Sequence, residues 1–101
     1  HCYSGSVEMA ELFIKLGYKL GIGGVVTFKN SKLYEVIEKF DIAKFVLETD
    51  SPFLAPEPFR GTLNNPYNIY YVAIKIAQIK GISFDEVISS NIKNISEVFD
   101  I

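Results

Sequence analysis

Apolar residues along this chain recur at helical spacing in some segments and as short unbroken runs in others. Residues 7–16 form the first helical pattern, which Ser6 can cap, and a second helical pattern begins near Ser31. Short apolar runs at residues 18–22 and 45–48 predict strands. This alternation of strand and helix predicts an α/β fold with a parallel sheet joined by right-handed crossovers.

The second half of the chain is predicted to be a long loop followed by helices. Residues 51–65 hold three prolines and exceed the usual length of such a connection, which is typical of a functional loop. A helix capped by Asn65 follows and ends near Gly81. Ser83 begins a capping box for a short helix, and a separate helix is predicted over 91–99. The inward-facing residues expected in that last helix are Ile92, Ile95 and Phe99.

Two carboxylates stand where the strand over residues 45–48 ends. Side chains alternate along a strand, so Glu48 and Asp50 are expected on one face and Thr49 on the other. Two acids aligned in this way repel each other unless a cation or hydrogen-bond donors lie between them. The spacing alone leaves two interpretations open, because one acid could instead cap the loop while the other is solvated.

Glycine and cysteine near the strand ends suggest two further interpretations. The run of residues 21–24, Gly-Ile-Gly-Gly, resembles a phosphate cradle only faintly and lacks the P-loop lysine, so we interpret it as a bend at the strand end. His1 beside Cys2 suggests a thiol nucleophile. Neighbours on a strand point to opposite faces, however, so Cys2 is expected to be packed away from His1.

Composition narrows the classes of function. The 101 residues carry 10 Lys and Arg against 12 Asp and Glu, a formal charge of -2, which argues against a phosphate-neutralising binding module but not against a metal-dependent enzyme. The single cysteine excludes an internal disulfide framework and suits a reducing cytoplasm. No apolar run approaches the roughly 20 residues of a membrane span, so we expect a cytoplasmic protein with no membrane partner.

The number of strands is small for a complete parallel sheet. Only two full strands are visible, and a two-stranded sheet has two open edges. The chain also begins with His1 rather than Met. We therefore expect the C-terminal part of a larger domain, whose missing N-terminal part, or another chain, covers the open edges.

Four motifs in fixed order resemble one family. They are HCYSGS at residues 1–6, GGVVTFKN at residues 23–30, LETDSPFLAP at residues 47–56, and Arg60-Gly61 with Asn64 after it. In this order and at these separations they resemble the C-terminal part of TatD-type metal-dependent deoxyribonucleases. The resemblance runs over residues 1–101, which would form the C-terminal part of a single TatD-like hydrolase domain.

The resemblance implies the C-terminal portion of a (β/α)₈ TIM-type barrel of the metallohydrolase superfamily, incomplete in this chain because a whole barrel needs about 250 residues. It also implies one or more divalent metal ions, Mg²⁺, Mn²⁺ or Zn²⁺, at the carboxyl ends of the strands. His1 would be a metal ligand, and Asp50 a metal ligand and the catalytic general base. The family's other ligands lie outside this chain, so the isolated chain is expected to be inactive.

Other site residues follow from the same resemblance. Arg60 and Asn64 are candidates for substrate binding, although Leu63 and Asn65 stand where the family commonly has an arginine and a glutamate. A lone arginine in a loop is more often a solvated or loop-bracing residue than a phosphate contact. Glu48 is expected to support the strand end, and Thr49 to brace the loop through its hydroxyl.

Three functions remain open after this reasoning. The first is hydrolysis of DNA phosphodiester bonds by a metal-activated water, with DNA as the substrate. The second keeps the metal site and changes the substrate to a non-nucleic ester or amide. The third is a non-catalytic assembly fragment whose sheet edges are covered by a partner.

Overall fold

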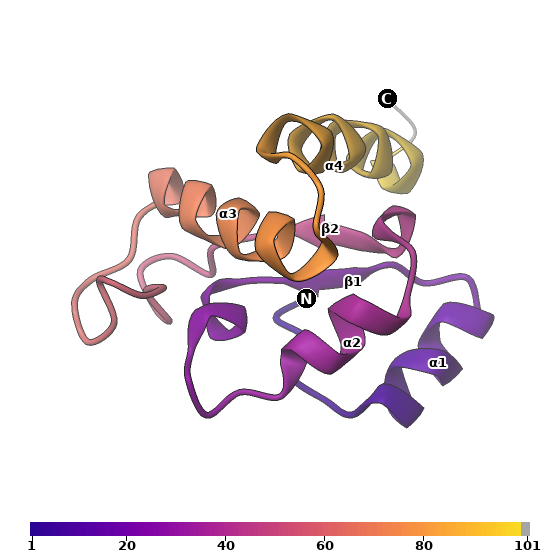
Figure 1. Ribbon diagram of the computed structural model, residues 1–101, viewed down its shortest axis with the longest axis horizontal. Coiled ribbons are helices and arrows are strands. Elements are labelled where there is room, and N and C mark those ends of the chain that lie inside the picture. The colour runs from indigo at the N-terminus through magenta and orange to yellow at the C-terminus, as the bar shows by residue number, and fades with distance from the viewer. Residues whose placement is uncertain (100–101) are drawn as a thin grey trace.

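The computed structural model describes residues 1–99, which form four α-helices, two strands and three short 3₁₀ turns (Figure 1). In chain order these elements are α1 (Val7–Lys15), β1 (Leu20–Ile22), η1 (Gly24–Thr27), α2 (Leu33–Lys39), η2 (Ile42–Lys44), β2 (Phe45–Leu47), η3 (Pro66–Asn68), α3 (Ile69–Lys80) and α4 (Phe84–Phe99). The expected α/β class is confirmed. No helix within residues 1–99 is long and apolar enough to cross a membrane.

The two strands pair in parallel, as the alternation of strand and helix predicts. Leu20 lies opposite Phe45, and Ile22 lies opposite Leu47. All four side chains are buried in one apolar core. The helices that cover this core pack in sequence, α1 on α2, α2 on α3 and α3 on α4 (Figure 1). One face of the sheet is therefore buried beneath helices.

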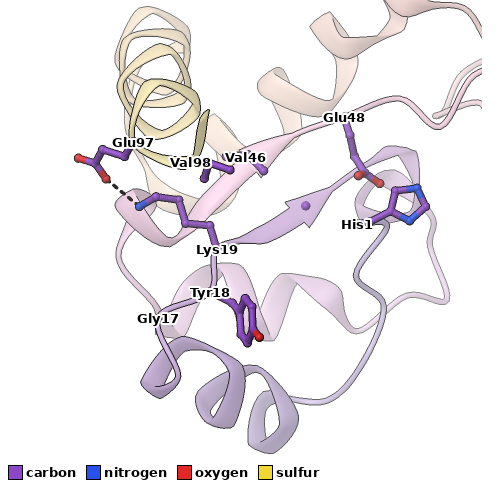
Figure 2. A pocket seen from close by; sticks show the side chains of 9 residues that line it. His1, Gly17, Tyr18, Lys19, Val46, Glu48, Glu97 and Val98 are labelled. Carbon is purple, nitrogen blue, oxygen red and sulfur yellow. Dashed lines mark ion pairs between the residues drawn. The ribbon is translucent and has the colours of Figure 1, made fainter. Parts of the chain in front are cut away.

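The opposite face of the sheet lines an open trough of about 670 Å³. Val46 lies near its middle, between two ends of different character (Figure 2). At one end are His1 and Glu48, and at the other Lys19 and Glu97 form an ion pair of 2.9 Å. Side chains alternate between faces along β2, so Val46 lines the trough while Phe45 and Leu47 are buried in the core.

Helix caps form where the local sequence predicts them. The Ser6 side chain accepts a hydrogen bond from the Met9 N–H at the start of α1. The Asn65 side chain accepts one from the Tyr67 N–H in the turn that leads into α3. Gly81 ends α3 in the left-handed conformation, with φ of 68°, which glycine adopts without a steric penalty.

The expectation of two helices after Ser83 is wrong, because α4 runs unbroken from Phe84 to Phe99. Two asparagines near the expected break turn inward and tie the helix to β2. Asn91 Oδ1 accepts a hydrogen bond of 2.9 Å from the Leu47 N–H, and the amide of Asn94 donates to two backbone carbonyls. Ile92 and Phe99 are instead 65% and 67% exposed, so the apolar face was assigned incorrectly.

These asparagines also change the picture of the sheet edges. The Glu48 N–H donates to the Ile22 carbonyl on β1, so the Leu47 N–H points to the outer edge of β2. There the Leu47 N–H and the Phe45 carbonyl are paired with α4 side chains. On the outer edge of β1, the Tyr3 N–H donates to the Gly21 carbonyl at 2.8 Å. Part of each edge is therefore covered by the chain itself.

Candidate functional site

His1 and Asp50 approach each other at the ends of the two strands. His1 Nε2 lies 3.7 Å from Asp50 Oδ1, although 48 residues separate them in the chain. The hydrogen bond from the Tyr3 N–H to β1 holds the segment that carries His1. Asp50 follows β2 by three residues. The structure thus brings together the two side chains that the resemblance implies as metal ligands.

Asp50 sits where the backbone leaves the strand direction. Its φ is +51°, in the left-handed region that aspartate tolerates better than most residues. Its carbonyl accepts a hydrogen bond of 2.8 Å from the Phe53 N–H, which closes a turn directly after it. The side chain of Asp50 is therefore placed by a turn that follows β2 and not by continuation of the strand.

Glu48 lies directly over β1, beneath the backbone of His1. A Cβ atom on Gly21 would lie 2.7 Å from Glu48 Oε2 and 3.2 Å from His1 Cα, so a larger residue here would force the Glu48 carboxylate to move. Within residues 1–99, Glu48 Oε1 is buried without a hydrogen-bond partner. Buried polar atoms are nearly always hydrogen-bonded in native proteins, so this unpaired oxygen makes Glu48 a candidate for a functional role.

Cys2 lies beside the same carboxylates, which corrects the expectation that it points away from His1. Its φ of +51° shows that this residue is not extended, so the alternation of a strand does not apply. Its Sγ lies 3.8 Å from Asp50 Oδ2, to which the thiol donates. Burial, followed by the carboxylates of Glu48 and Asp50, raises the pKa of the Cys2 thiol to about 11. The thiol is therefore protonated at neutral pH, which disfavours a thiol nucleophile.

Asn64 is buried and organises the loop that carries Asp50. Its amide nitrogen donates to the carbonyls of Thr49 and Phe53, and its Oδ1 accepts from the Asn68 side chain at 2.9 Å. Asn64 is only 6% exposed. With donors and acceptor engaged inside the protein, Asn64 has no polar group directed at a ligand, so the geometry favours a structural role over the expected substrate contact. Thr49 carries its own brace, a hydroxyl contact of 2.9 Å to Ser51 Oγ.

Arg60 lies on the face of an aromatic ring. Its guanidinium carbon is 3.9 Å from the centroid of Phe28, which is close enough for a cation–π interaction. The residue is exposed, so its N–H donors remain accessible to solvent. This stacking supports the loop-bracing interpretation of Arg60, and its substrate contact stays a prediction.

The proline-rich loop is seated on the segment after β1. A Cβ atom on Gly24 would lie 2.3 Å from the Leu54 carbonyl oxygen, so the loop backbone packs directly on this glycine. The Glu57 N–H donates to Thr27 Oγ1 at 2.8 Å. Sequence reasoning assigned the glycines to a bend and missed that Gly24 and Thr27 hold the loop. Both residues belong to the motif GGVVTFKN, but the loop residues that they contact lie 30 residues further along the chain.

The residues present fit only a share of a metal centre. Within residues 1–99, no three His, Cys, Asp or Glu side chains form a group that could hold a metal ion. Two ligands with bonds of about 2.0–2.2 Å to one ion lie at most about 4.4 Å apart, and His1 and Asp50 satisfy this limit at 3.7 Å. The imidazole nitrogen and the carboxylate are suitable donors for Zn²⁺ or Mn²⁺.

Comparison with known proteins shows which proteins this chain is similar to. The chain is 42% identical to the uncharacterized metal-dependent hydrolase YabD of Bacillus subtilis, covering all of this chain and 40% of YabD. It is 34% identical to the uncharacterized metal-dependent hydrolase YjjV of Escherichia coli, covering 39% of that protein. The chain thus spans about two fifths of the length of these curated relatives.

Solved structures agree with this assignment. The crystal structure of YjjV, a TatD homologue, matches all of this chain and 39% of its own with a TM-score of 0.93 and 34% identity. A hydrolase TatD family protein from Entamoeba histolytica shares the fold with a TM-score of 0.81 at 22% identity, over 95% of this chain and 40% of its own. The fold class is confirmed as the C-terminal portion of a TIM-type barrel, incomplete in this chain. Residues 1–100 match the family model for TatD-related DNases, and the chain belongs to that family.

Proposed function

We propose that this chain supplies two ligands to the active site of a metal-dependent hydrolase, and that the reaction is cleavage of DNA phosphodiester bonds. The observation that carries the proposal is the approach of His1 Nε2 to Asp50 Oδ1, 3.7 Å apart at the carboxyl ends of parallel strands. Active sites of barrel enzymes lie on that rim. The relatives are named metal-dependent hydrolases, which supports a metal-dependent hydrolytic reaction. The matching family model is described as TatD-related DNase, which supports DNA as the substrate.

Each residue has a role in this mechanism. A divalent ion held by His1 and Asp50, together with ligands from outside this chain, would lower the pKa of a bound water and offset phosphate charge. Asp50 Oδ1 faces His1, whereas Oδ2 accepts from the Cys2 thiol. Asp50 would orient the water and accept its proton as the general base. Glu48 would support the strand end, since its carboxylate lies against Gly21 of β1.

The uncovered trough indicates what completes the site. Val46 and Glu48 face it without a covering element among residues 1–99. Met9 and Leu12 on α1 and Leu16 directly after it are 49%, 52% and 65% exposed. We infer that the N-terminal part of a barrel, or another chain in its place, covers these surfaces and brings the remaining ligands. The isolated chain would then be inactive. A reducing cytoplasm suits its free thiol.

A chimera provides the test. The chain would replace the matching 39% of YjjV from E. coli, and a labelled single-stranded oligonucleotide would be assayed with Mg²⁺, Mn²⁺ or Zn²⁺ and with EDTA. We expect metal-dependent cleavage that falls by about 10²- to 10⁴-fold in Asp50→Asn, because the general base is lost. Asp85→Asn, an exposed acid of α4, serves as the matched control.

Two outcomes would contradict the proposal. Cleavage that persists in EDTA, or that is equal in Asp50→Asn and Asp85→Asn, would show that this edge is not the catalytic one. Ester and amide substrates are assayed in parallel. If they are hydrolysed and DNA is not, the deoxyribonuclease assignment is wrong while the hydrolase assignment stands.

A further inference from the structure

Two grooves beside the proline-rich loop share one wall. That wall is the pair formed by the Arg60 guanidinium stacked 3.9 Å above the Phe28 ring, which we call the Phe28–Arg60 ridge. Both residues line a groove of about 630 Å³ on one side and a groove of about 350 Å³ on the other. The two grooves differ in chemistry.

The larger groove is apolar. Phe53 and Leu63, which line it, are 66% and 81% exposed, and Leu54 is 40% exposed. Large apolar side chains gathered at this exposure commonly mark a binding surface. The exposed ring of Phe53 offers an aromatic face of the kind on which a nucleobase stacks, and Leu54 and Leu63 extend the apolar surface beside it.

The smaller groove is polar and cationic. Lys32 and Arg60 are the only charged side chains that line either groove within residues 1–99, although the whole chain has a formal charge of -2. Ser31 and Asn30 add polar side chains to the same groove. A pair of cations without a facing acid complements a phosphate, which guanidinium groups bind through two parallel N–H donors.

The apolar groove is fixed relative to the proposed catalytic residue. Phe53 closes the turn after Asp50 by donating its N–H to the Asp50 carbonyl, and Asn64 holds the Phe53 carbonyl at 2.9 Å. On the opposite side the Leu54 carbonyl rests on Gly24. A ligand seated on the ridge would therefore keep a constant position relative to the strand end.

We propose that the Phe28–Arg60 ridge seats one nucleotide of a single-stranded DNA substrate, with the base in the apolar groove and the phosphate at Arg60 and Lys32. This inference rests on the proposed function and adds a binding site to it. Neither His1 nor Asp50 lines either groove, so the seat contributes affinity without depending on the metal. That independence separates the test of the seat from the test of cleavage.

Binding is measured by fluorescence anisotropy of the 101-residue chain with a labelled thymidine oligonucleotide in EDTA, at several salt concentrations. Arg60→Gln is expected to reduce the slope of log affinity against log salt by about 0.7, one phosphate contact on a single strand. Leu63→Ser is expected to weaken binding several-fold, because it removes the most exposed apolar side chain that the base would cover in the larger groove. Lys15→Gln, on the exposed surface of α1, is the control and should change neither.

An oligonucleotide without bases separates stacking from charge. It should bind the unmodified chain and Leu63→Ser equally, while still responding to Arg60→Gln. Arg60 and Leu63 are exposed, so both variants should keep the fold, which circular dichroism checks. The proposal is overturned if the chain does not bind the oligonucleotide, if Arg60→Gln leaves the salt slope unchanged, or if base removal has no effect. Loss of cleavage in the chimera with intact binding would contradict only the proposed function.

Discussion

Replacing Asn64 with alanine tests whether this residue organises the loop or contacts substrate. The change removes four hydrogen bonds: two that the Asn64 amide donates to the Thr49 and Phe53 carbonyls, and two that its Oδ1 accepts from the Asn65 N–H and the Asn68 side chain. At about 1 kcal/mol for each of the four bonds, the free energy of unfolding should fall by about 4 kcal/mol. For a chain of this size, with a urea m-value of about 1–3 kcal/mol/M, the midpoint should fall by about 1–4 M.

The assay is urea unfolding of the chain, followed by far-UV circular dichroism. Asn64→Asp adds a second test, because it keeps the shape but places a carboxylate against two carbonyl oxygens. Its loss of stability should be largest at neutral pH and smaller in acid, where the protonated carboxyl can donate one bond. Asn30→Ala, at an exposed asparagine, is the control and should shift the midpoint little. If Asn64→Ala leaves the midpoint unchanged and only raises the KM of the chimera for DNA, the reasoning is refuted.

Three further predictions concern the loop, the sheet edge and the thiol. Gly24→Ala should lower the free energy of unfolding by about 1–3 kcal/mol and speed proteolysis of the proline-rich loop, because the new Cβ would lie 2.3 Å from the Leu54 carbonyl oxygen. An unchanged urea midpoint and an unchanged rate of proteolysis would contradict this. Asn94→Ala should cost about 2 kcal/mol in urea unfolding, since two hydrogen bonds that hold α4 to η2 and β2 are lost, and a loss under 0.5 kcal/mol would show that α4 is held otherwise. Burial and the carboxylates of Glu48 and Asp50 raise the pKa of the Cys2 thiol to about 11. The metal-free chain should therefore react with iodoacetamide at pH 8 more slowly than free cysteine does, and its rate should rise towards pH 11. A rate that levels off near pH 9 would be inconsistent with this environment.

Local signals predicted the parts of the fold that depend on neighbouring residues. Ser6, Asn65 and Gly81 lie at helix ends as the sequence indicates, because capping needs only residues close in the chain. The path of α4 was not predictable in this way. From the sequence alone, Asn91 and Asn94 would be assigned to the polar surface of the helix. Their hydrogen-bond partners on β2, Leu47 and Phe45, lie 44 and 49 residues away in the chain.

In the candidate site, too, some features could be predicted from the sequence and others depend on contacts between distant residues. His1 and Asp50 were assigned from motifs, and the structure brings them within 3.7 Å. The place of Cys2 could not be predicted, because a positive φ at a cysteine is uncommon and reverses the side chain's expected direction. The burial of Asn64 likewise depends on a loop that folds back on the strand end, which no periodicity in the sequence records.

The central claim is that His1 and Asp50 are this chain's share of a metal centre. Its most direct test is calorimetric titration of Mn²⁺ or Zn²⁺ into the YjjV chimera and its variants, without substrate. The account predicts that Asp50→Asn and His1→Ala each weaken metal binding at least about tenfold, while Asp85→Asn binds as the unmodified chimera does. Equal affinity in all four proteins would contradict the account, because the strand ends described here would then hold no metal.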